Sequence, residues 1–218
     1  MSFDTAAVLV TGANRGLGRA FAREFARRGA KVYAGVRNPA SVVDEGVIPV
    51  RLDVTDAAQV EAAAKELGDV SIVVNNAGVL VEGEGLDGIQ AEFDVNVYGI
   101  VRVTDAFAPI LKANGGGTLV NVLSILSFVG RADWRGYAAS KAAAWSLTNS
   151  TRDALRDQGT HVVAVHSAFI DTDMAAAQTG PKISTEDLVA QVLRAVENGD
   201  DEVLADDRTR AVKASLAS

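Results

Sequence analysis

The chain of 218 residues contains no cysteine, only two histidines and only four prolines. Without cysteine the protein has no disulfide and no thiolate chemistry, which agrees with a cytoplasmic location. Two histidines without cysteine argue against a structural zinc site, and we expect no bound metal. No apolar run reaches the length of a transmembrane helix, and the first residues lack the basic and apolar pattern of a signal peptide. We therefore expect no association with a membrane.

The balance of charge is acidic. With 28 acidic and 21 basic residues, the formal net charge is −7. Such a surface repels polyanions, so the sequence argues against a nucleic-acid partner. The hydrophobic fraction of 48% and the charged fraction of 22% are typical of a soluble globular protein. The length suits one sizeable domain, expected over residues 1–218, and is short for two.

The most informative stretch lies near the N-terminus, where an apolar run at 6–10 leads into a turn with three glycines. Leu17, Phe21 and Phe25 then mark one face of an amphipathic helix. A strand, a glycine turn and a helix together present free backbone N–H groups and a positive dipole end to a phosphate. Glycine lets a pyrophosphate approach the backbone closely. The pattern predicts a nucleotide site, with an ordinary glycine-rich turn as the alternative.

Apolar strands and amphipathic helices alternate along the rest of the chain, which predicts an α/β fold with a parallel sheet covered on both faces. Further strands are expected at 31–36, 47–52, 71–74, 118–123, 161–165 and 202–204. Helices are expected at 57–67, 89–113 (kinked at Pro109), 136–158 with Leu147 on a buried side, 184–197, and after 206. Residues 80–88 are expected to form a loop. Ligands bind such sheets where the strands end, and polar or glycine residues stand at those ends: Gly12, Arg37, Asp53, Asn75, Ser124 and His166.

Tyr137 and Lys141 are spaced so that both side chains project from one face of the expected helix. A phenol with a pKa of about 10 is a poor base at neutral pH. A nearby ammonium lowers that pKa, which would turn the pair into a proton donor and acceptor. Ser124 ends a strand thirteen residues earlier, and its hydroxyl can donate to a carbonyl oxygen on which charge develops. Each of these residues also has a plain structural interpretation: a packed tyrosine, a solvated lysine and a serine that caps a turn.

Taken together, these residues resemble the short-chain dehydrogenase/reductase family. The matching elements are Thr11-Gly12-x-x-x-Gly16-x-Gly18, Asn75-Asn76-Ala77-Gly78, Asn96, Ser124 and Tyr137-x-x-x-Lys141, in that order. The resemblance runs from Val8 to about Leu204 and implies a single doubly wound Rossmann-type domain of about seven parallel strands. It also implies hydride transfer between a nicotinamide cofactor and a carbonyl or alcohol.

The resemblance implies four catalytic residues. Tyr137 would be the general acid or base, and Lys141 would lower its pKa and hold the nicotinamide ribose. Ser124 would orient the substrate oxygen, and Asn96 would hold a water that links Lys141 to solvent. A buried asparagine that bonds backbone is the alternative for Asn96. Cofactor contacts are expected from Gly12, Asn14, Arg15, Gly16, Leu17, Gly18, Arg37, Asp53, Val54, Asn76, Ala77, Gly78, Tyr137, Lys141, Phe169 and Thr172.

The residue after the second strand bears on the choice between NAD(H) and NADP(H). An NAD site places a carboxylate there to accept hydrogen bonds from the ribose 2′-hydroxyl. Val36 occupies that position and cannot accept, whereas Arg37 follows it and Arg15 lies in the glycine loop. Guanidinium groups suit a 2′-phosphate. We therefore expect a preference for NADP(H), unless both arginines are plain surface residues.

The chain departs from the family after the strand at 161–165, where Ser167-Ala168 replaces the usual Pro-Gly. His166 precedes them and is interpreted as a strand-end histidine that bonds backbone. The stretch at 174–183, where the family builds a substrate lid, is short. We therefore expect an open pocket that accepts varied small aldehydes, ketones or alcohols. Its expected lining is Ile125, Leu126, Trp134, Phe169 and Met174.

The two long helices at 89–113 and 136–158 are rich in alanine and could pack across a two-fold axis, so a homodimer or homotetramer is expected. The favoured function is an NADPH-dependent carbonyl reductase or alcohol dehydrogenase. Two alternatives stay open: a non-catalytic NADP(H)-binding module that senses redox state, and another chemistry on the same scaffold, such as epimerisation or lyase action.

Overall fold

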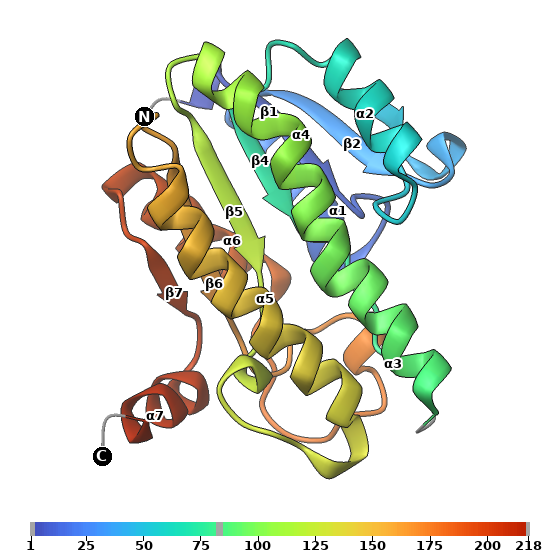
Figure 1. Ribbon diagram of the computed structural model, residues 1–218, viewed down its shortest axis with the longest axis vertical. Coiled ribbons are helices and arrows are strands. Elements are labelled where there is room, and N and C mark those ends of the chain that lie inside the picture. The colour runs from blue at the N-terminus through green and yellow to red at the C-terminus, as the bar shows by residue number, and fades with distance from the viewer. Residues whose placement is uncertain (1–2, 82–84, 217–218) are drawn as a thin grey trace.

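The computed structural model describes residues 3–81 and 85–216, in which strands and helices alternate (Figure 1). The strands are β1 (Ala7–Thr11), β2 (Lys31–Val36), β3 (Val47–Arg51), β4 (Ile72–Asn75), β5 (Thr118–Val122), β6 (His161–His166) and β7 (Glu202–Leu204). The helices are α1 (Gly16–Arg27), α2 (Ala57–Glu66), α3 (Leu86–Phe93), α4 (Ile100–Ala113), α5 (Arg135–Ala154), α6 (Thr185–Asn198) and α7 (Asp207–Ser215).

The seven strands form one parallel sheet in the order β3-β2-β1-β4-β5-β6-β7. This confirms the predicted α/β class and the doubly wound, Rossmann-type topology. The chain moves outward from β1 in one direction through β2 and β3, and in the other direction from β4 onward. The crevice at the carboxyl ends of β1 and β4, where this direction reverses, is where such sheets bind ligands.

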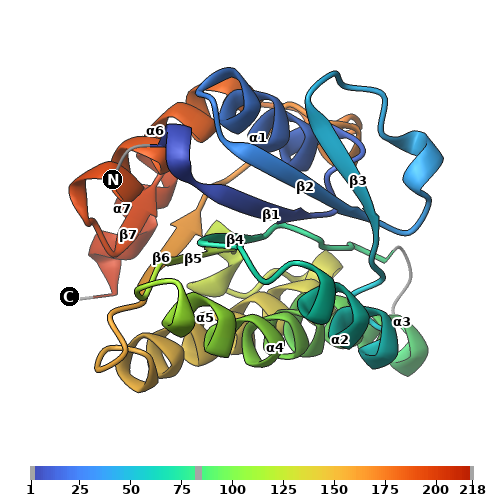
Figure 2. The same ribbon diagram turned by 90° about the horizontal axis from the view of Figure 1, so that it is seen from above.

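Helices cover both faces of the sheet. Figure 2 shows α1 and α6 on one face and α2, α4 and α5 on the other. Because side chains alternate along a strand, Val8 and Val10 of β1 pack with Phe21 and Phe25 of α1, whereas Leu9 packs toward α4. Burial of apolar side chains on both faces explains why the strands read as continuous apolar runs.

The prediction of one helix over 89–113 is wrong in two respects: the helix starts earlier, and it is interrupted. Helical structure begins at Leu86 in α3, and a π-type turn over Asp94–Gly99 separates α3 from α4. Pro109 lies within α4, so the irregular turn falls well before the position expected from the proline. Of the expected loop at 80–88, residues 82–84 lie outside the described residues, and Leu86 onward is helical.

Helix α5 ends at Ala154, earlier than the expected end near Gln158, and turns lead from there to Gly159. Leu147 on α5 is 37% exposed, so the expectation of a buried position was wrong. Among the described helices, none is long and apolar enough to cross a membrane. Over the same residues, no group of three His, Cys, Asp or Glu side chains is placed to hold a metal ion.

Candidate active site

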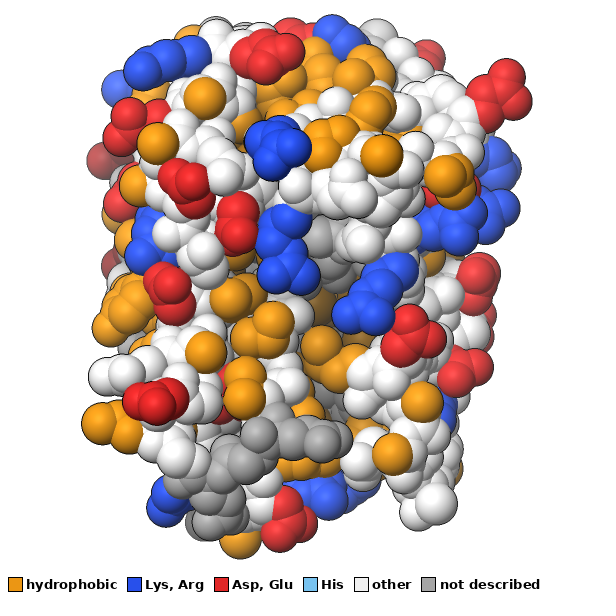
Figure 3. All heavy atoms as spheres, turned by 90° about the vertical axis from the view of Figure 1, so that its right-hand side faces the viewer, with side chains coloured by type: hydrophobic (Ala, Val, Ile, Leu, Met, Phe, Trp, Pro, Cys, Tyr) orange, Lys and Arg blue, Asp and Glu red, His pale blue; other side chains and the backbone are white. Residues whose placement is uncertain are grey.

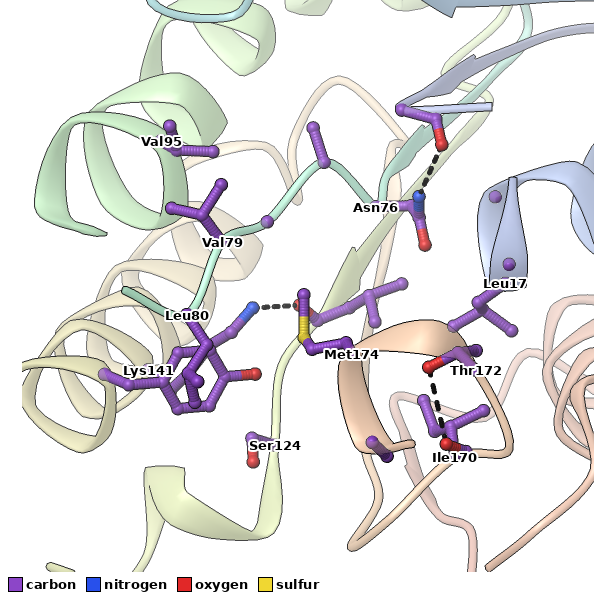
Figure 4. Close-up of a pocket in the computed structure, with 18 of the residues that line it drawn as sticks. Leu17, Asn76, Val79, Leu80, Val95, Ser124, Lys141, Ile170, Thr172 and Met174 are labelled. Atoms are coloured by element: carbon purple, nitrogen blue, oxygen red, sulfur yellow. Dashed lines mark hydrogen bonds between the residues drawn. The ribbon is translucent and has the colours of Figure 1, made fainter. Parts of the chain in front are cut away.

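A pocket of about 920 Å³ opens at the carboxyl ends of the strands and runs from the glycine turn after β1 to the loops after β5 and β6. This volume lies at the upper end of the range for ligand sites. Figure 3 shows one face of the molecule with a hollow near its middle, bordered by Lys and Arg side chains. Figure 4 shows Lys141 and Ser124 on one side of the pocket and Leu17 and Thr172 on the other.

The structure brings every site residue expected from the sequence to this pocket, except Asn96. Residues expected to contact cofactor line it from the segments that follow β1, β2, β3, β4 and β6, and from α5. The expected substrate residues lie on the loops that follow β5 and β6: Ile125, Leu126, Trp134, Phe169 and Met174. The sheet topology therefore gathers segments that are far apart in the chain at one place.

The glycine turn adopts backbone conformations that need glycine. Gly12 and Gly16 have φ values of +67° and +51°. A Cβ on Gly18 would lie 2.3 Å from the carbonyl oxygen of Gly12, so α1 can pack this closely only with glycine there. No side chain caps the first turn of α1, which leaves its N–H groups available to a ligand. These features fit the pyrophosphate of a dinucleotide.

A set of hydrogen bonds joins the ends of β1 and β4 beside the pocket. Thr11 Oγ1 accepts the backbone N–H groups of Asn76 and Ala77, each at 3.0 Å. Asn76 Nδ2 in turn donates to the Thr11 carbonyl at 2.9 Å. Asn75 points into the core instead, where it donates to Asn121 Oδ1 at 3.0 Å. These hydrogen bonds hold the glycine turn against β4. Of the Asn75–Gly78 motif, only the residues after Asn75 line the pocket.

The proton-transfer group consists of three side chains. Ser124 follows β5; its hydroxyl accepts the Leu126 N–H at 3.1 Å and lies close enough to the Tyr137 phenol, on the first turn of α5, to favour the ionised form of that phenol. One turn later, Lys141 Nζ lies 5.6 Å from the centre of the Tyr137 ring and donates to the Val122 carbonyl at 2.9 Å. Helical spacing thus places the phenol and the ammonium beside the same strand end, and both line the pocket together with Ser124.

The pKa values in this group differ from the sequence expectation. Burial, helped by the negative charge of Glu92, raises the pKa of Tyr137 to about 12, and the Ser124 hydrogen bond only partly opposes this. Lys141 is not among the causes of this shift, so its expected lowering of the phenol pKa stays a prediction. Burial also lowers the pKa of Lys141 to about 8. The phenol is held in its protonated form over the neutral range, as a proton donor requires.

Asn96 lies in the π-type turn and is fully buried. Its side chain accepts from the Val79 N–H and donates to the Val79 carbonyl, both at 2.9 Å, and also donates to Ser140 Oγ at 3.0 Å. All hydrogen-bonding atoms of the side-chain amide are engaged in this way. Asn96 thus joins the segment after β4, which lines the pocket through Val79 and Leu80, to α5.

His166 lies behind Ser124 and outside the pocket. Its Nδ1 lies 3.0 Å from the Ser124 carbonyl, and its ring stacks on Phe128 with 4.3 Å between centroids. Burial lowers the pKa of this histidine to about 4, so the ring is neutral and Nδ1–H donates to the carbonyl. His166 thus hydrogen-bonds a backbone carbonyl, as the sequence suggested. This contact holds the backbone of Ser124 from the side away from the pocket.

Ser167 and Ala168, which replace the usual Pro-Gly, are held by two backbone contacts. The Ser167 carbonyl accepts the Ile125 N–H at 2.8 Å. The Ala168 N–H donates to Asp206 Oδ2 at 2.8 Å. Asp206 also caps α7 by accepting the Thr209 N–H. Asp206 therefore ties the loop after β6 to the C-terminal helix.

Sequence reasoning missed Glu92, Arg131 and Arg208. Glu92 is only 4% exposed, and its Oε1 accepts the Val81 N–H at 3.0 Å. A Cβ on Gly136 would lie 2.3 Å from Glu92 Oε2, so this carboxylate packs against the start of α5. An acidic residue between Ile89 and Phe93 in the sequence was the available signal. Arg131 and Arg208 both line the pocket, but they lie in charged stretches without any periodic signal.

The two arginines expected at a 2′-phosphate line the same pocket. Arg37 follows the buried Val36 at the end of β2. Arg15 lies in the glycine turn, and its guanidinium is 3.5 Å from Asp173 across the pocket, with both side chains mostly exposed. An ion pair this exposed is weak. The Arg15 guanidinium is therefore available to an incoming phosphate.

Comparison with known proteins identifies the family. The model of the short chain dehydrogenases matches residues 6–182. The chain belongs to the short-chain dehydrogenase family. Galactitol 2-dehydrogenase of Agrobacterium fabrum is 34% identical over 78% of this chain and 73% of its own length. The members of this family named here are oxidoreductases, which agrees with the resemblance in sequence.

Solved structures of short-chain dehydrogenases superpose closely. One from Burkholderia cenocepacia, in complex with NADP, is 36% identical, with a TM-score of 0.94 over 100% of this chain and 95% of that one. Another from Burkholderia phymatum, in complex with NAD, is 26% identical, with a TM-score of 0.88 over 100% and 93%. Similar short-chain dehydrogenases thus bind either nucleotide.

Proposed function

We propose that this short-chain dehydrogenase is an NADPH-dependent carbonyl reductase or alcohol dehydrogenase acting on small aldehydes, ketones or alcohols. The observation that carries the proposal is the Tyr137 phenol, close to the Ser124 hydroxyl and next to Lys141, in the pocket that also contains the glycine turn. A non-catalytic nucleotide-binding module has no need for this trio.

In the proposed reaction, a nicotinamide cofactor supplies the hydride in the direction of reduction. Ser124 donates a hydrogen bond to the carbonyl oxygen and holds it beside the phenol. Tyr137 gives its proton to that oxygen as negative charge develops there. The charge on Lys141 stabilises the phenolate that forms, and the Val122 carbonyl keeps the ammonium in place. Asn96 acts as a positioning residue for Val79 and α5.

Preference for NADPH rests on Arg15, Arg37 and the apolar Val36. The two guanidinium groups line the nucleotide end of the pocket and suit a 2′-phosphate, whereas valine cannot accept a hydrogen bond from a free 2′-hydroxyl. The bound NADP in the similar Burkholderia cenocepacia structure supports this choice.

We also propose a homodimer or homotetramer formed through α4 and α5. These helices lie side by side on one face of the sheet (Figure 1). Leu147 of α5 is 37% exposed, and Tyr98, in the π-type turn that leads into α4, is 52% exposed. Apolar side chains exposed on neighbouring helices suit a two-fold interface. Sedimentation at micromolar concentration tests this, and a stable monomer would contradict it.

The function is tested by supplying purified protein with NADPH or NADH and a panel of aldehydes, ketones and diketones. Loss of the reduced-nicotinamide absorbance is recorded for each pair. We expect turnover of several carbonyl compounds, because the pocket is open, and faster turnover with NADPH. Binding of neither nucleotide, together with no turnover, would overturn the proposal.

A further inference from the structure

The substrate end of the pocket carries an aromatic pair. Trp134 and Phe169 meet edge to face, with 6.2 Å between ring centroids. Trp134 lies in the loop that joins Ser124 to Tyr137, and Phe169 lies in the loop after β6. Both line the pocket that contains the proton donor. When the carbonyl oxygen of a substrate reaches Ser124 and Tyr137, the rest of the substrate therefore lies beside these two rings.

One cation lies directly on this aromatic pair. The Arg131 guanidinium lies 4.0 Å from the centre of the Trp134 ring, close enough for a cation–π contact. The Asp133 Oδ2 atom lies 3.8 Å from Arg131 Nε, which is outside hydrogen-bonding distance, and the Asp133 side chain is 78% exposed. Stacking fixes the guanidinium plane while its edge N–H groups stay available for a ligand.

A second cation reaches the same end of the pocket from the C-terminal helix. Asp206 accepts the N–H of Ala168, the residue before Phe169, and so holds the start of α7 beside the aromatic pair. Arg208 follows two residues later and lines the pocket. Within residues 3–81 and 85–216, no hydrogen bond or ion pair is recorded for its guanidinium. Its charge is thus available to a ligand.

We infer that the substrates of this enzyme carry an anionic group, such as a carboxylate, on the side of the molecule away from the reacting carbonyl, and that Arg131 and Arg208 recognise it. Two arginines at the mouth of a pocket stand out in a chain with a net charge of −7. Of the acidic residues near this end, Asp133 is paired only loosely with Arg131 and highly exposed, and Asp206 is engaged by the N–H groups of Ala168 and Thr209.

This recognition is separate from that of the nucleotide. Arg15 and Arg37 follow β1 and β2, whereas Arg131 and Arg208 lie in segments that follow β5 and β7. The sheet order places two strands, β1 and β4, between β2 and β5, so one anion cannot use both pairs. The inference rests on the proposed function, to which it adds the class of substrate.

The test uses two aromatic ketones of the same size, para-acetylbenzoate and its neutral amide, para-acetylbenzamide. Binding of each to protein saturated with NADP is measured by calorimetry, and reduction of each is measured with NADPH. We expect the acid to bind about tenfold more tightly than the amide, since each exposed charge pair contributes a few-fold. Raising the salt concentration should weaken binding of the acid and leave the amide unchanged.

Arg131→Ala and Arg208→Ala should each lower the ratio of acid affinity to amide affinity by about threefold, and the double variant should abolish the preference for the acid. The affinity for the amide should stay unchanged within about twofold in all of these variants. Arg210→Ala is the matched control, because Arg210 lies on the same helix but bonds Asp207 and the Leu204 carbonyl and does not line the pocket. Arg37→Ala is the control at the nucleotide end. Both controls should keep the preference.

Equal binding of acid and amide by the unaltered protein, or a preference that survives the double variant, would overturn the inference. Failure of the proposed function has a different signature: neither ketone is reduced, although the acid still binds more tightly than the amide.

Discussion

Lys141 Nζ donates to the carbonyl oxygen of Val122, the last residue of β5, at 2.9 Å, and this contact fixes an ammonium 5.6 Å from the centre of the Tyr137 ring. The lysine is only 4% exposed. Its burial lowers the pKa to about 8, which brings the loss of its charge close to physiological pH.

The first prediction concerns the pH dependence of carbonyl reduction. Because the Lys141 ammonium supports the developing phenolate, kcat/KM for reduction should fall as pH rises through about 8, whereas Tyr137 itself, with a pKa of about 12, stays protonated there. Initial rates between pH 6 and about 10 check this. A constant kcat/KM across this range would show that the charge on Lys141 does not matter for the reaction.

The second prediction concerns Glu92, whose negative charge raises the pKa of Tyr137. Glu92→Gln keeps the shape and removes the charge, so the phenolate becomes easier to form. Oxidation of an alcohol, which needs phenolate, should become about threefold faster at fixed neutral pH, as expected for a pKa change of about half a unit. Reduction should change less.

The matched control for Glu92 is Asp94→Asn. Asp94 lies two residues further along but forms an exposed ion pair with Arg102 at 2.8 Å. Its removal should leave the ratio of oxidation to reduction unchanged. The role assigned to Glu92 fails if Glu92→Gln also leaves this ratio unchanged.

The third prediction concerns cofactor choice. Arg37→Asp replaces a cation at the 2′-phosphate with a carboxylate that can accept from a 2′-hydroxyl, so the ratio of kcat/KM with NADPH to that with NADH should fall by about a hundredfold. Arg51→Asp is the control, because Arg51 pairs with Val36 on the neighbouring strand and does not line the pocket. Equal efficiency of the unaltered enzyme with both nucleotides would refute the preference.

The fourth prediction concerns acid stability. Since His166 has a folded pKa of about 4 against an ordinary 6.5, the unfolded chain binds a proton that the folded one does not. The contribution of the neutral His166 to the free energy of unfolding is therefore fully present above pH 6.5. As pH falls from 6.5 toward 4, the free energy of unfolding decreases by about 3 kcal/mol. The groups that face it are Glu202, Lys213 and Lys141. The Phe128 and Trp145 rings enclose the same side chain.

His166→Gln should therefore lose less stability than the unaltered protein between pH 7 and 4 in denaturant titrations. Parallel pH profiles for the two proteins would show that the histidine does not titrate in this way.

The alternation of apolar strands and amphipathic helices was enough to predict the parallel sheet, because burial on both faces leaves a continuous apolar run in each strand. The spacing of Tyr137 and Lys141 was enough to place both beside Ser124. The π-type turn at Asn96 was not predictable, since it accompanies hydrogen bonds to Val79, far away in the sequence.

Two further features of the site depend on packing that a sequence pattern does not contain. The raised pKa of Tyr137 comes from burial and from Glu92 on another helix. Arg208 lines the pocket next to a contact between segments far apart in the chain, in which Asp206 binds the Ala168 N–H. Long-range contacts of this kind decide both the electrostatics and the lining of the substrate end.

The central claim, that Tyr137 donates the proton, is tested most directly by Tyr137→Phe, with NADPH binding and carbonyl reduction measured on the same sample. Tyr98→Phe is the control, because that side chain is 52% exposed and lies outside the pocket. The account predicts an unchanged dissociation constant for NADPH and a reduction rate lower by about a hundredfold to ten-thousandfold. A variant that binds NADPH and keeps most of the rate would contradict it.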